Sequence, residues 1–493
     1  MSGQTVVSVE TMSIPTYPVM DCETMPMFNE NRQHQGTKGN PYPVMPVLSV
    51  VREDKAPVEY EVIRLENDYI RLIIIPRLGG RIFEAYDKVN DYHFLYRQHV
   101  IKPALIGAYG LWISGGLEFN WPFHHRPSTF MPVNFTTETQ ADGTAIAWLS
   151  ECDPTDRTRA TVGIVLRPDA AWFETRIQVT NRTPLRHSFL MWQNGAVRVN
   201  ENYQFIFPPD VTYVTHHHSS SRAPLTYPVA QGSYAGGWYD DPTDISWYKN
   251  NHFATSHFAA PSKYDFFGGY DHGQRRGVIH ISDRFVSPGK KMFTWGVGDL
   301  GASWEKALTD DDGPYCELMA GSFSNNQPDF TWLNPYESKT FSEYWYPVGA
   351  LGRASFATLE AAVFVDGAAG VMRVQTTRAQ KRLTVALRAG GTDALNALID
   401  TEPCRPVELR FAPFEGMYEI VLTDDAGEEL LRYAQEKPDA LHMPEPVALN
   451  PHPDDIATVQ ELWLQGLHAD QYRHPQIEPS VYYEDQSHHG CKS

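Results

Sequence analysis

Apolar and polar residues alternate along much of the region from residue 56 to residue 352. In the stretch AWFETRIQVTN, one face carries Phe173, Thr175, Ile177 and Val179. A period of two is the pattern of a half-buried antiparallel strand. Two further strands are expected on either side of Asn67 and Asp68, and turn sequences such as RLGGR and VSPGKK separate others. The pattern predicts an all-β supersandwich of large antiparallel sheets over residues 56–352, without an amphipathic helix.

The rest of the chain divides into three segments. Residues 1–55 are rich in Pro, Met and Asn and are expected to form an extended segment. Short, evenly spaced strands such as KRLTVALRAG predict a small β-sandwich over residues 353–447. Residues 448–493 contain a helical pattern and a tail, with Asp454 or Asp455 as the expected N-cap. The apolar stripe expected on this helix consists of Ile456, Val459, Leu462, Trp463 and Leu467.

Composition and charge narrow the classes of partner. The net charge of -19 over 493 residues argues against binding to nucleic acid or to an anionic membrane. The start of the sequence lacks a secretory pattern, and five scattered cysteines without a CxxC pair favour a reducing cytoplasm. No metal and no cofactor are expected, and a homo-oligomer is left open. The 12 tryptophans and 25 tyrosines could stack on sugar rings, although aromatic residues also fill β cores.

Two acidic residues stand in apolar surroundings. Glu118 lies in GGLEFNWPFHHRP, and this stretch supplies the candidate sugar-binding residues Asn120, Trp121, His124, His125 and Arg126. Glu317 lies in PYCELMAG, where an isolated acid should have a raised pKa suited to acid–base catalysis. The alternatives are an ion pair of Glu118 with Arg126 and a buried structural ion pair at Glu317.

Other stretches add weaker candidates. Asp271 is a third candidate acid, and the substrate-binding candidates are Trp192, Asn194, His257, His272 and Gln327. The adjacent histidines 216–218 favour an exposed loop over a zinc site, because neighbouring residues on a strand do not share one face. The sequence has no GxSxG, P-loop or HExxH motif, so serine hydrolase, nucleotide-binding and zinc protease functions lose their usual support.

Longer motifs resemble a known superfamily. PRLGGRIFEAYDK is similar to an early strand pair of galactose-mutarotase-like proteins, in which the residue after the glycine pair, here Arg81, enters the sugar cleft. GGLEFNWPFHHRPSTF and WGVGDLGASWEKALTDDDGPYCELMAG resemble an uncharacterised bacterial domain-of-unknown-function family, usually found ahead of tetratricopeptide repeats. No 34-residue repeat follows here. The resemblance implies a carbohydrate cleft with a late-strand Glu base, matched by Glu317, and a His acid, for which His125, His257 and His272 are candidates.

Three functions follow as hypotheses. The first is a glycoside hydrolase or transglycosylase that acts on an oligosaccharide or polysaccharide, with Glu118 and Glu317 as its carboxylate pair. The second is an aldose 1-epimerase-like isomerase that uses Glu317 with a histidine. The third is a non-catalytic carbohydrate-binding protein. The fold alone does not choose among them.

Overall fold

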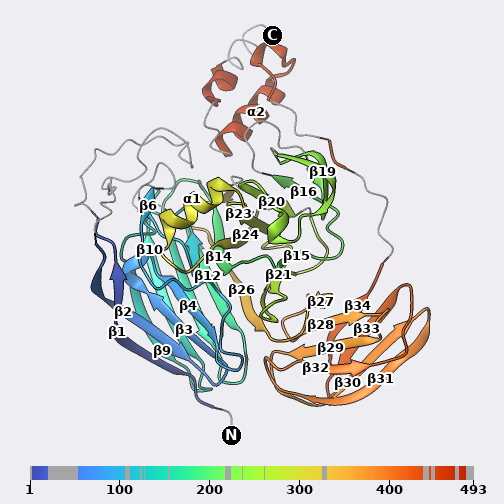
Figure 1. The fold of residues 1–493 in the computed structure, drawn as a ribbon. Coiled ribbons are helices and arrows are strands. Elements are labelled where there is room, and N and C mark those ends of the chain that lie inside the picture. Colours follow the sequence, from blue (N-terminus) through green and yellow to red (C-terminus); the bar gives the residue numbers. More distant parts are fainter. Residues whose placement is uncertain are drawn as a thin grey trace.

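The computed structural model describes most of the chain (Figure 1). The described residues are 3–19, 54–105, 111–122, 125–126, 128–153, 156–216, 224–235, 237–259, 261–324, 330–436, 443–445, 450–471 and 477–484. Predicted candidates His124 and Gln327 lie outside them.

Two large antiparallel sheets face each other. The first has twelve strands in the order β1 (Val6–Thr16), β2 (Ala56–Glu66), β3 (Ile70–Ile75), β4 (Arg81–Asp87), β8 (Leu117–Asn120), β14 (Met191–Arg198), β24 (Tyr315–Ser322), β23 (Gly289–Thr294), β20 (Thr255–Ala259), β16 (Tyr213–His216) and β17 (Pro224–Thr226), with β5 (Tyr92–His93) on β4. The second has eight, in the order β15 (Tyr203–Ile206), β21 (Phe266–Asp271), β22 (Arg276–Ser282), β26 (Ser338–Val348), β12 (Phe173–Thr180), β11 (Arg159–Leu166), β10 (Ala145–Cys152) and β9 (Asn134–Thr139). The predicted supersandwich and all-β class are confirmed.

Alternating residues build the core between these sheets. On β8, Leu117 and Phe119 point into the main apolar cluster, where they meet Leu149 and Val162 of the eight-stranded sheet. The residues between them on β8 therefore face the opposite side of the twelve-stranded sheet, which we call its outer face.

One fully buried carboxylate ties the two sheets together. Glu343 of β26 accepts hydrogen bonds from Ser287 (2.7 Å), Ser322 (2.9 Å), Gln193 (2.8 Å) and His280 (3.0 Å). Both oxygens are thus satisfied by two donors each, as a buried carboxylate requires.

A small sandwich follows the large one in the chain and is drawn orange in Figure 1. One of its sheets has the strand order β27 (Phe356–Ala357), β28 (Ala361–Asp366), β29 (Val371–Thr376) and β32 (Val407–Arg410). The other has the order β31 (Thr392–Thr401), β30 (Gln380–Ala389), β33 (Tyr418–Thr423) and β34 (Glu429–Ala434). One apolar cluster joins it to the far side of the eight-stranded sheet, because Phe266 and Tyr346 pack with Phe356 and Tyr433. The small sandwich therefore covers the large one on that side.

Shorter elements complete the described fold. Three two-stranded pairs are β6 (Ala104–Leu105) with β7 (Leu111–Trp112), β13 (His187–Phe189) with β25 (Thr331–Leu333), and β18 (Val229–Tyr234) with β19 (Gly237–Asp244). The 3-10 turns are η1 (Pro76–Leu78), η2 (Tyr248–Asn250) and η3 (Pro453–Asp455). The helices are α1 (Asp299–Leu308) and α2 (Val459–Gln471). No helix in the described part of the chain is long and apolar enough to cross a membrane.

Both helices correct the sequence predictions. Helix α1 lies in a region where only strands were expected, and it packs on the outer face through Leu308 against Ala196 and Tyr315. Its buried residues are Gly301 and Leu308, and the partly buried Trp304 and Ala307 pack beside Leu308.

The cap and the stripe of α2 also differ from the prediction. The first turn is capped by Thr458, whose hydroxyl accepts from Glu461 N at 3.2 Å and also bonds its carboxylate. Asp454 and Asp455 instead belong to η3. Trp463, predicted to lie in the apolar stripe, is 46% exposed.

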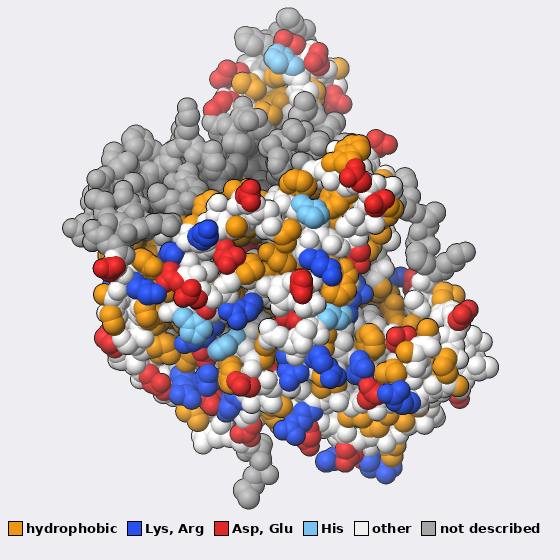
Figure 2. All heavy atoms as spheres, viewed as in Figure 1, with side chains coloured by type: hydrophobic (Ala, Val, Ile, Leu, Met, Phe, Trp, Pro, Cys, Tyr) orange, Lys and Arg blue, Asp and Glu red, His pale blue; other side chains and the backbone are white. Residues whose placement is uncertain are grey.

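The surface carries charges of both signs. Figure 2 shows acidic and basic side chains interspersed over the visible face. The net charge of -19 is therefore not gathered into one acidic region on that face.

Candidate active site

Three neighbouring strands bring acidic and amide side chains to the outer face. Asn194 of β14 pairs in register with Glu118 of β8 on one side and with Met319 of β24 on the other. Glu317 lies two residues before Met319, so its side chain points to the same face. The two acids, nearly two hundred positions apart in the chain, therefore share one face on strands about 10 Å apart.

Glu118 is held as an ionised carboxylate. It is 2% exposed, its Oε2 accepts from Trp112 Nε1 at 3.1 Å and lies 3.3 Å from His125 Nδ1, and its Oε1 lies 3.6 Å from Arg81 Nη2. Burial acts to raise the pKa of Glu118, but the His125 hydrogen bond and the Arg81 charge outweigh it and lower the pKa to about 2.

Local backbone explains why two glycines precede this acid. Gly116 has a φ of +65°, and a Cβ on it would lie 1.9 Å from the carbonyl oxygen of Ile82. Only glycine allows β8 to approach β4 this closely. Arg81 begins β4, and its guanidinium bonds Gly115 O and Thr129 Oγ1, which places it beside Glu118.

Glu317 has the opposite electrostatic character. It is 4% exposed, and burial raises its pKa. The charges of His125 and Lys291 and a hydrogen bond with Asn194 oppose this shift, while the negative charge of Glu118 adds to it. The two acids therefore have pKa values shifted in opposite directions, an arrangement found in acid–base pairs of active sites.

Lys291 is a site residue that the sequence analysis missed. It pairs in register with Met319 and so lies on the same outer face, with its Nζ 5.0 Å from the ring centre of Phe258. Burial lowers its pKa to about 8, while Glu317 acts to raise it. The alternation in KKMFTW could have indicated that one of two neighbouring lysines faces each side.

Several buried polar atoms on this face have no hydrogen-bond partner among the described residues. They are Arg81 Nε, Glu118 Oε1, Asn120 Nδ2 and Asn194 Oδ1. Buried polar atoms are nearly always hydrogen-bonded in proteins. This set of donors and acceptors therefore suits a ligand rich in hydroxyl groups.

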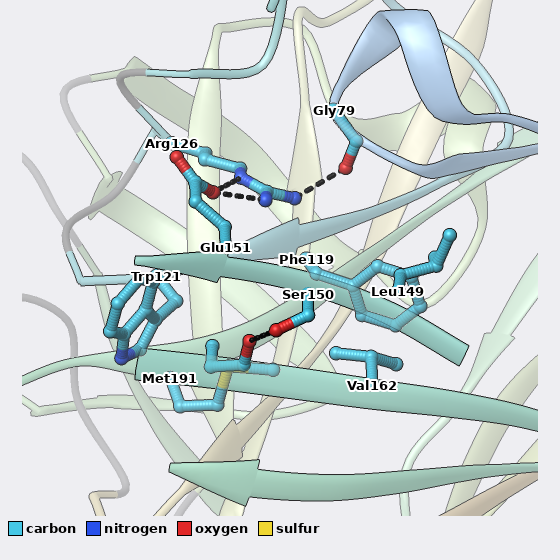
Figure 3. A pocket seen from close by; sticks show the side chains of 10 residues that line it. Gly79, Phe119, Trp121, Arg126, Leu149, Ser150, Glu151, Val162 and Met191 are labelled. Carbon is cyan, nitrogen blue, oxygen red and sulfur yellow. Dashed lines mark hydrogen bonds and ion pairs between the residues drawn. The ribbon is translucent and has the colours of Figure 1, made fainter. Parts of the chain in front are cut away.

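Trp121 and Arg126, predicted to bind substrate, point elsewhere. Trp121 belongs to the core between the sheets, and the Arg126 guanidinium bonds Glu151 and Gly79 O (Figure 3). The alternative of an ion pair between Arg126 and Glu118 is therefore wrong, because Arg126 pairs with Glu151 and Arg81 lies beside Glu118.

The cavity in Figure 3 does not suit a sugar. It lies on the core side of β8 and is lined by Phe119, Trp121, Arg126, Leu149 and Met191 among others. Its volume of about 20 Å³ is enough for a single water molecule, which needs about 10–15 Å³.

Asp271 and His272 lie away from the two glutamates. Asp271 ends β21 of the eight-stranded sheet and accepts from Asn200, Gly273 N and Gln274 N, so it stabilises a turn. His272 bonds Gln204 at 3.0 Å and stacks on Trp247. These contacts give Asp271 and His272 a role in the local structure around the end of β21.

His257 lies on the wrong side of the sheet for the proposed role. It pairs in register with His216 and with Met292, which is a core residue, so its ring faces the sandwich interior. Burial lowers its pKa to about 3. His216, expected in an exposed loop, is buried in β16.

Trp192 shares the outer face with Asn120 but is fully buried. Its ring packs edge-on against Phe258, and its Nε1 donates to Ser324 at 3.1 Å. Trp192 is therefore a packing residue beside the site. Of the predicted set, the structure brings together Arg81, Glu118, Asn120, His125, Asn194 and Glu317.

A pH titration of stability tests the state of Glu118. Its folded pKa of about 2 lies below the ordinary value of 4.5, so the unfolded chain takes up this proton first as the pH falls. The stability it contributes is complete above pH 4.5 and is lost toward pH 2. Between pH 6 and pH 3, the free energy of unfolding measured in urea should fall by about 2 kcal/mol more for the native protein than for Glu118→Gln. Equal losses would show that Glu118 is not held ionised.

Comparisons with known proteins agree with this architecture. The paired antiparallel sheets define an all-β protein built on a large two-sheet sandwich. Residues 39–348 match a domain of unknown function, DUF5107, and the chain belongs to that family, as its motifs predicted.

Solved structures are similar to parts of this chain. A TPR-domain containing protein from Parabacteroides distasonis is 22% identical, with a TM-score of 0.60 over 70% of this chain and 56% of that chain. The present chain thus spans little more than half the length of that protein. Galactose mutarotase-like proteins from Clostridium acetobutylicum and Lactobacillus casei are 12% and 11% identical, with TM-scores of 0.41 and 0.40. The matches cover 59% and 58% of this chain, and 96% and 99% of the two mutarotase-like proteins.

Proposed function

We propose that the protein is a carbohydrate-active enzyme that cleaves glycosidic bonds, with Glu118 and Glu317 as the reacting carboxylates. The observation that carries this proposal is the placement of both buried acids on one face, on the two strands that flank β14. Glycoside hydrolysis generally uses two carboxylates that flank the bond to be broken.

The surroundings of the two acids suggest their roles. The raised pKa of Glu317 favours its protonated form, which would donate a proton to the leaving glycosidic oxygen. Glu118 stays ionised and would act as the base or nucleophile at the anomeric carbon. Its Oε1 forms no hydrogen bond among the described residues and lies 3.6 Å from Arg81 Nη2, so this oxygen would act while paired with the Arg81 charge.

Neighbouring side chains would orient the sugar. Asn120 Nδ2 can donate to a hydroxyl group and Asn194 Oδ1 can accept from one. Arg81 and Trp112 fix the Glu118 carboxylate through its two oxygens. The expected substrate is an oligosaccharide or polysaccharide.

A second function has one specific observation in its favour. His125 lies 3.3 Å from Glu118, and its charge also acts on Glu317. A histidine beside a buried glutamate could protonate the ring oxygen while Glu317 removes the anomeric proton, which is the chemistry of an aldose 1-epimerase.

Proton NMR of the protein with a panel of neutral and acidic oligosaccharides separates the possibilities. Hydrolysis produces new reducing-end anomeric signals, which is the expected result. Faster exchange between anomers without new reducing ends would support epimerisation. Shifted or broadened ligand signals without any product would point to a binding protein and contradict the proposed enzyme.

A further inference from the structure

Strand β1 forms a long open edge of the twelve-stranded sheet. It runs for 11 residues, lies at the end of the strand order, and pairs with β2 without a bulge (Figure 1). Val6 and Val9 are 55% and 48% exposed. Edge strands are normally protected by a bulge, by charged side chains or proline, or by a covering segment, because they can pair with another chain. Strand β1 has Glu10 and Pro15 but no bulge.

Hydrogen bonds at one end show which backbone groups face outward. Ile101 N donates to Pro15 O at 2.9 Å, and Tyr17 N donates to Ile101 O at 3.0 Å. Odd-numbered residues of β1 therefore direct their N–H and C=O groups away from β2, since these groups alternate along a strand. Over the described residues, Val7, Val9, Thr11 and Ser13 form no bond on that side.

We propose that this edge pairs antiparallel with β1 of a second copy of the chain, making a twofold dimer with one continuous sheet. The twofold axis passes through Val9. Val9 then faces its own copy, Val7 faces Thr11, and Ser8 faces Glu10. Such a twofold contact is self-complementary, as a closed dimer interface must be.

Charge and hydrogen bonding select this register. An axis through Glu10 would set Glu10 against its copy, and like charges directly opposite are destabilising. An axis through Thr11 would set Val7 against Pro15, which has no N–H and whose carbonyl already accepts from Ile101. The axis through Val9 avoids both conflicts.

The second sheet can extend the same contact. Strand β9 is the edge of the eight-stranded sheet and lies beside β1. Its residues Thr136, Thr137 and Thr139 are β-branched, polar and exposed. A twofold axis at β1 would bring the two β9 edges toward each other, enlarging the interface beyond a single pair of strands.

The oligomeric state of the full chain tests the pairing. We expect a dimer by sedimentation velocity, and a monomer for Thr11→Pro. The Thr11 N–H points to the open edge, so proline there removes no bond within one copy. A native monomer, or a Thr11→Pro dimer, would overturn the proposal.

Cysteine crosslinking tests the register independently of folding losses. Opposed Val9 residues would have Cα atoms about 5.5 Å apart, within reach of a disulfide. Diamide oxidises the two thiols to a disulfide and takes up their two protons and two electrons, so Val9→Cys should form a covalent dimer. Thr11→Cys is the matched control, because its copies would lie about 13 Å apart. Equal crosslinking of both variants, or of neither, would rule out this register.

Discussion

Glu317→Gln is expected to lower turnover about 10²–10⁴-fold while leaving glycan affinity almost unchanged. Glutamine keeps the shape and the hydrogen bond with Asn194 but has no proton to give to the leaving oxygen. The measurement is kcat and KM on the glycan that the NMR panel identifies. A rise in KM with unchanged kcat would assign Glu317 to binding instead.

Asp271→Asn is the matched control for that variant. Asp271 was a candidate acid by sequence, but its carboxylate accepts backbone N–H groups in a turn of the other sheet. The asparagine Oδ1 can accept both backbone bonds, and only the bond from Asn200 is lost, so turnover should stay within about twofold of native. Loss of turnover in Asp271→Asn comparable to that of Glu317→Gln would mean that the reaction uses a different acid pair.

Glu343→Ala is expected to lower the free energy of unfolding by about 3–5 kcal/mol. The substitution leaves His280, Gln193, Ser287 and Ser322 without their shared acceptor in the middle of the sandwich. Each donor then loses a buried hydrogen bond, although Gln193 keeps its bond to Thr175 and Ser287 its bond to Ser322. A buried donor without an acceptor costs more than the bond itself contributes. Urea unfolding followed by tryptophan fluorescence gives the change.

An exposed ion pair provides the comparison for Glu343. Glu408 bonds Arg373 at 3.0 Å on the surface of the small sandwich. Glu408→Ala should change the free energy of unfolding by less than about 1 kcal/mol, because solvent screens such pairs. A similar small change in Glu343→Ala would show that the buried network does not stabilise the two sheets.

Strand periodicity was the most predictable property of this chain. The period-two pattern around Phe173 corresponds to β12, and the turn at Asn67 and Asp68 separates β2 from β3. These features depend on local sequence. Helix α1 was missed because it spans only 10 residues in a region otherwise patterned as strands, although Trp304, Ala307 and Leu308 pack in one apolar cluster at helical spacing.

The site was predictable only in part. An isolated acid in an apolar strand marked both Glu118 and Glu317, but the arginine beside Glu118 could not be found by proximity in sequence. Arg81 reaches it because Gly116 lets β8 pass close to β4. Likewise, the side of the sheet on which His257 lies depends on its register with β16 and β23, which no local pattern encodes.

The apolar contact between the two sandwiches bears on how this family evolves. The family match ends at residue 348, yet Tyr346 and Phe266 are covered by Phe356 and Tyr433 beyond that point. A gene fragment cut at the family boundary would encode a protein with these rings in water, prone to self-association. The two sandwiches are therefore expected to be inherited together, and a homologue that lost the second would need polar residues at the positions of Phe266 and Tyr346.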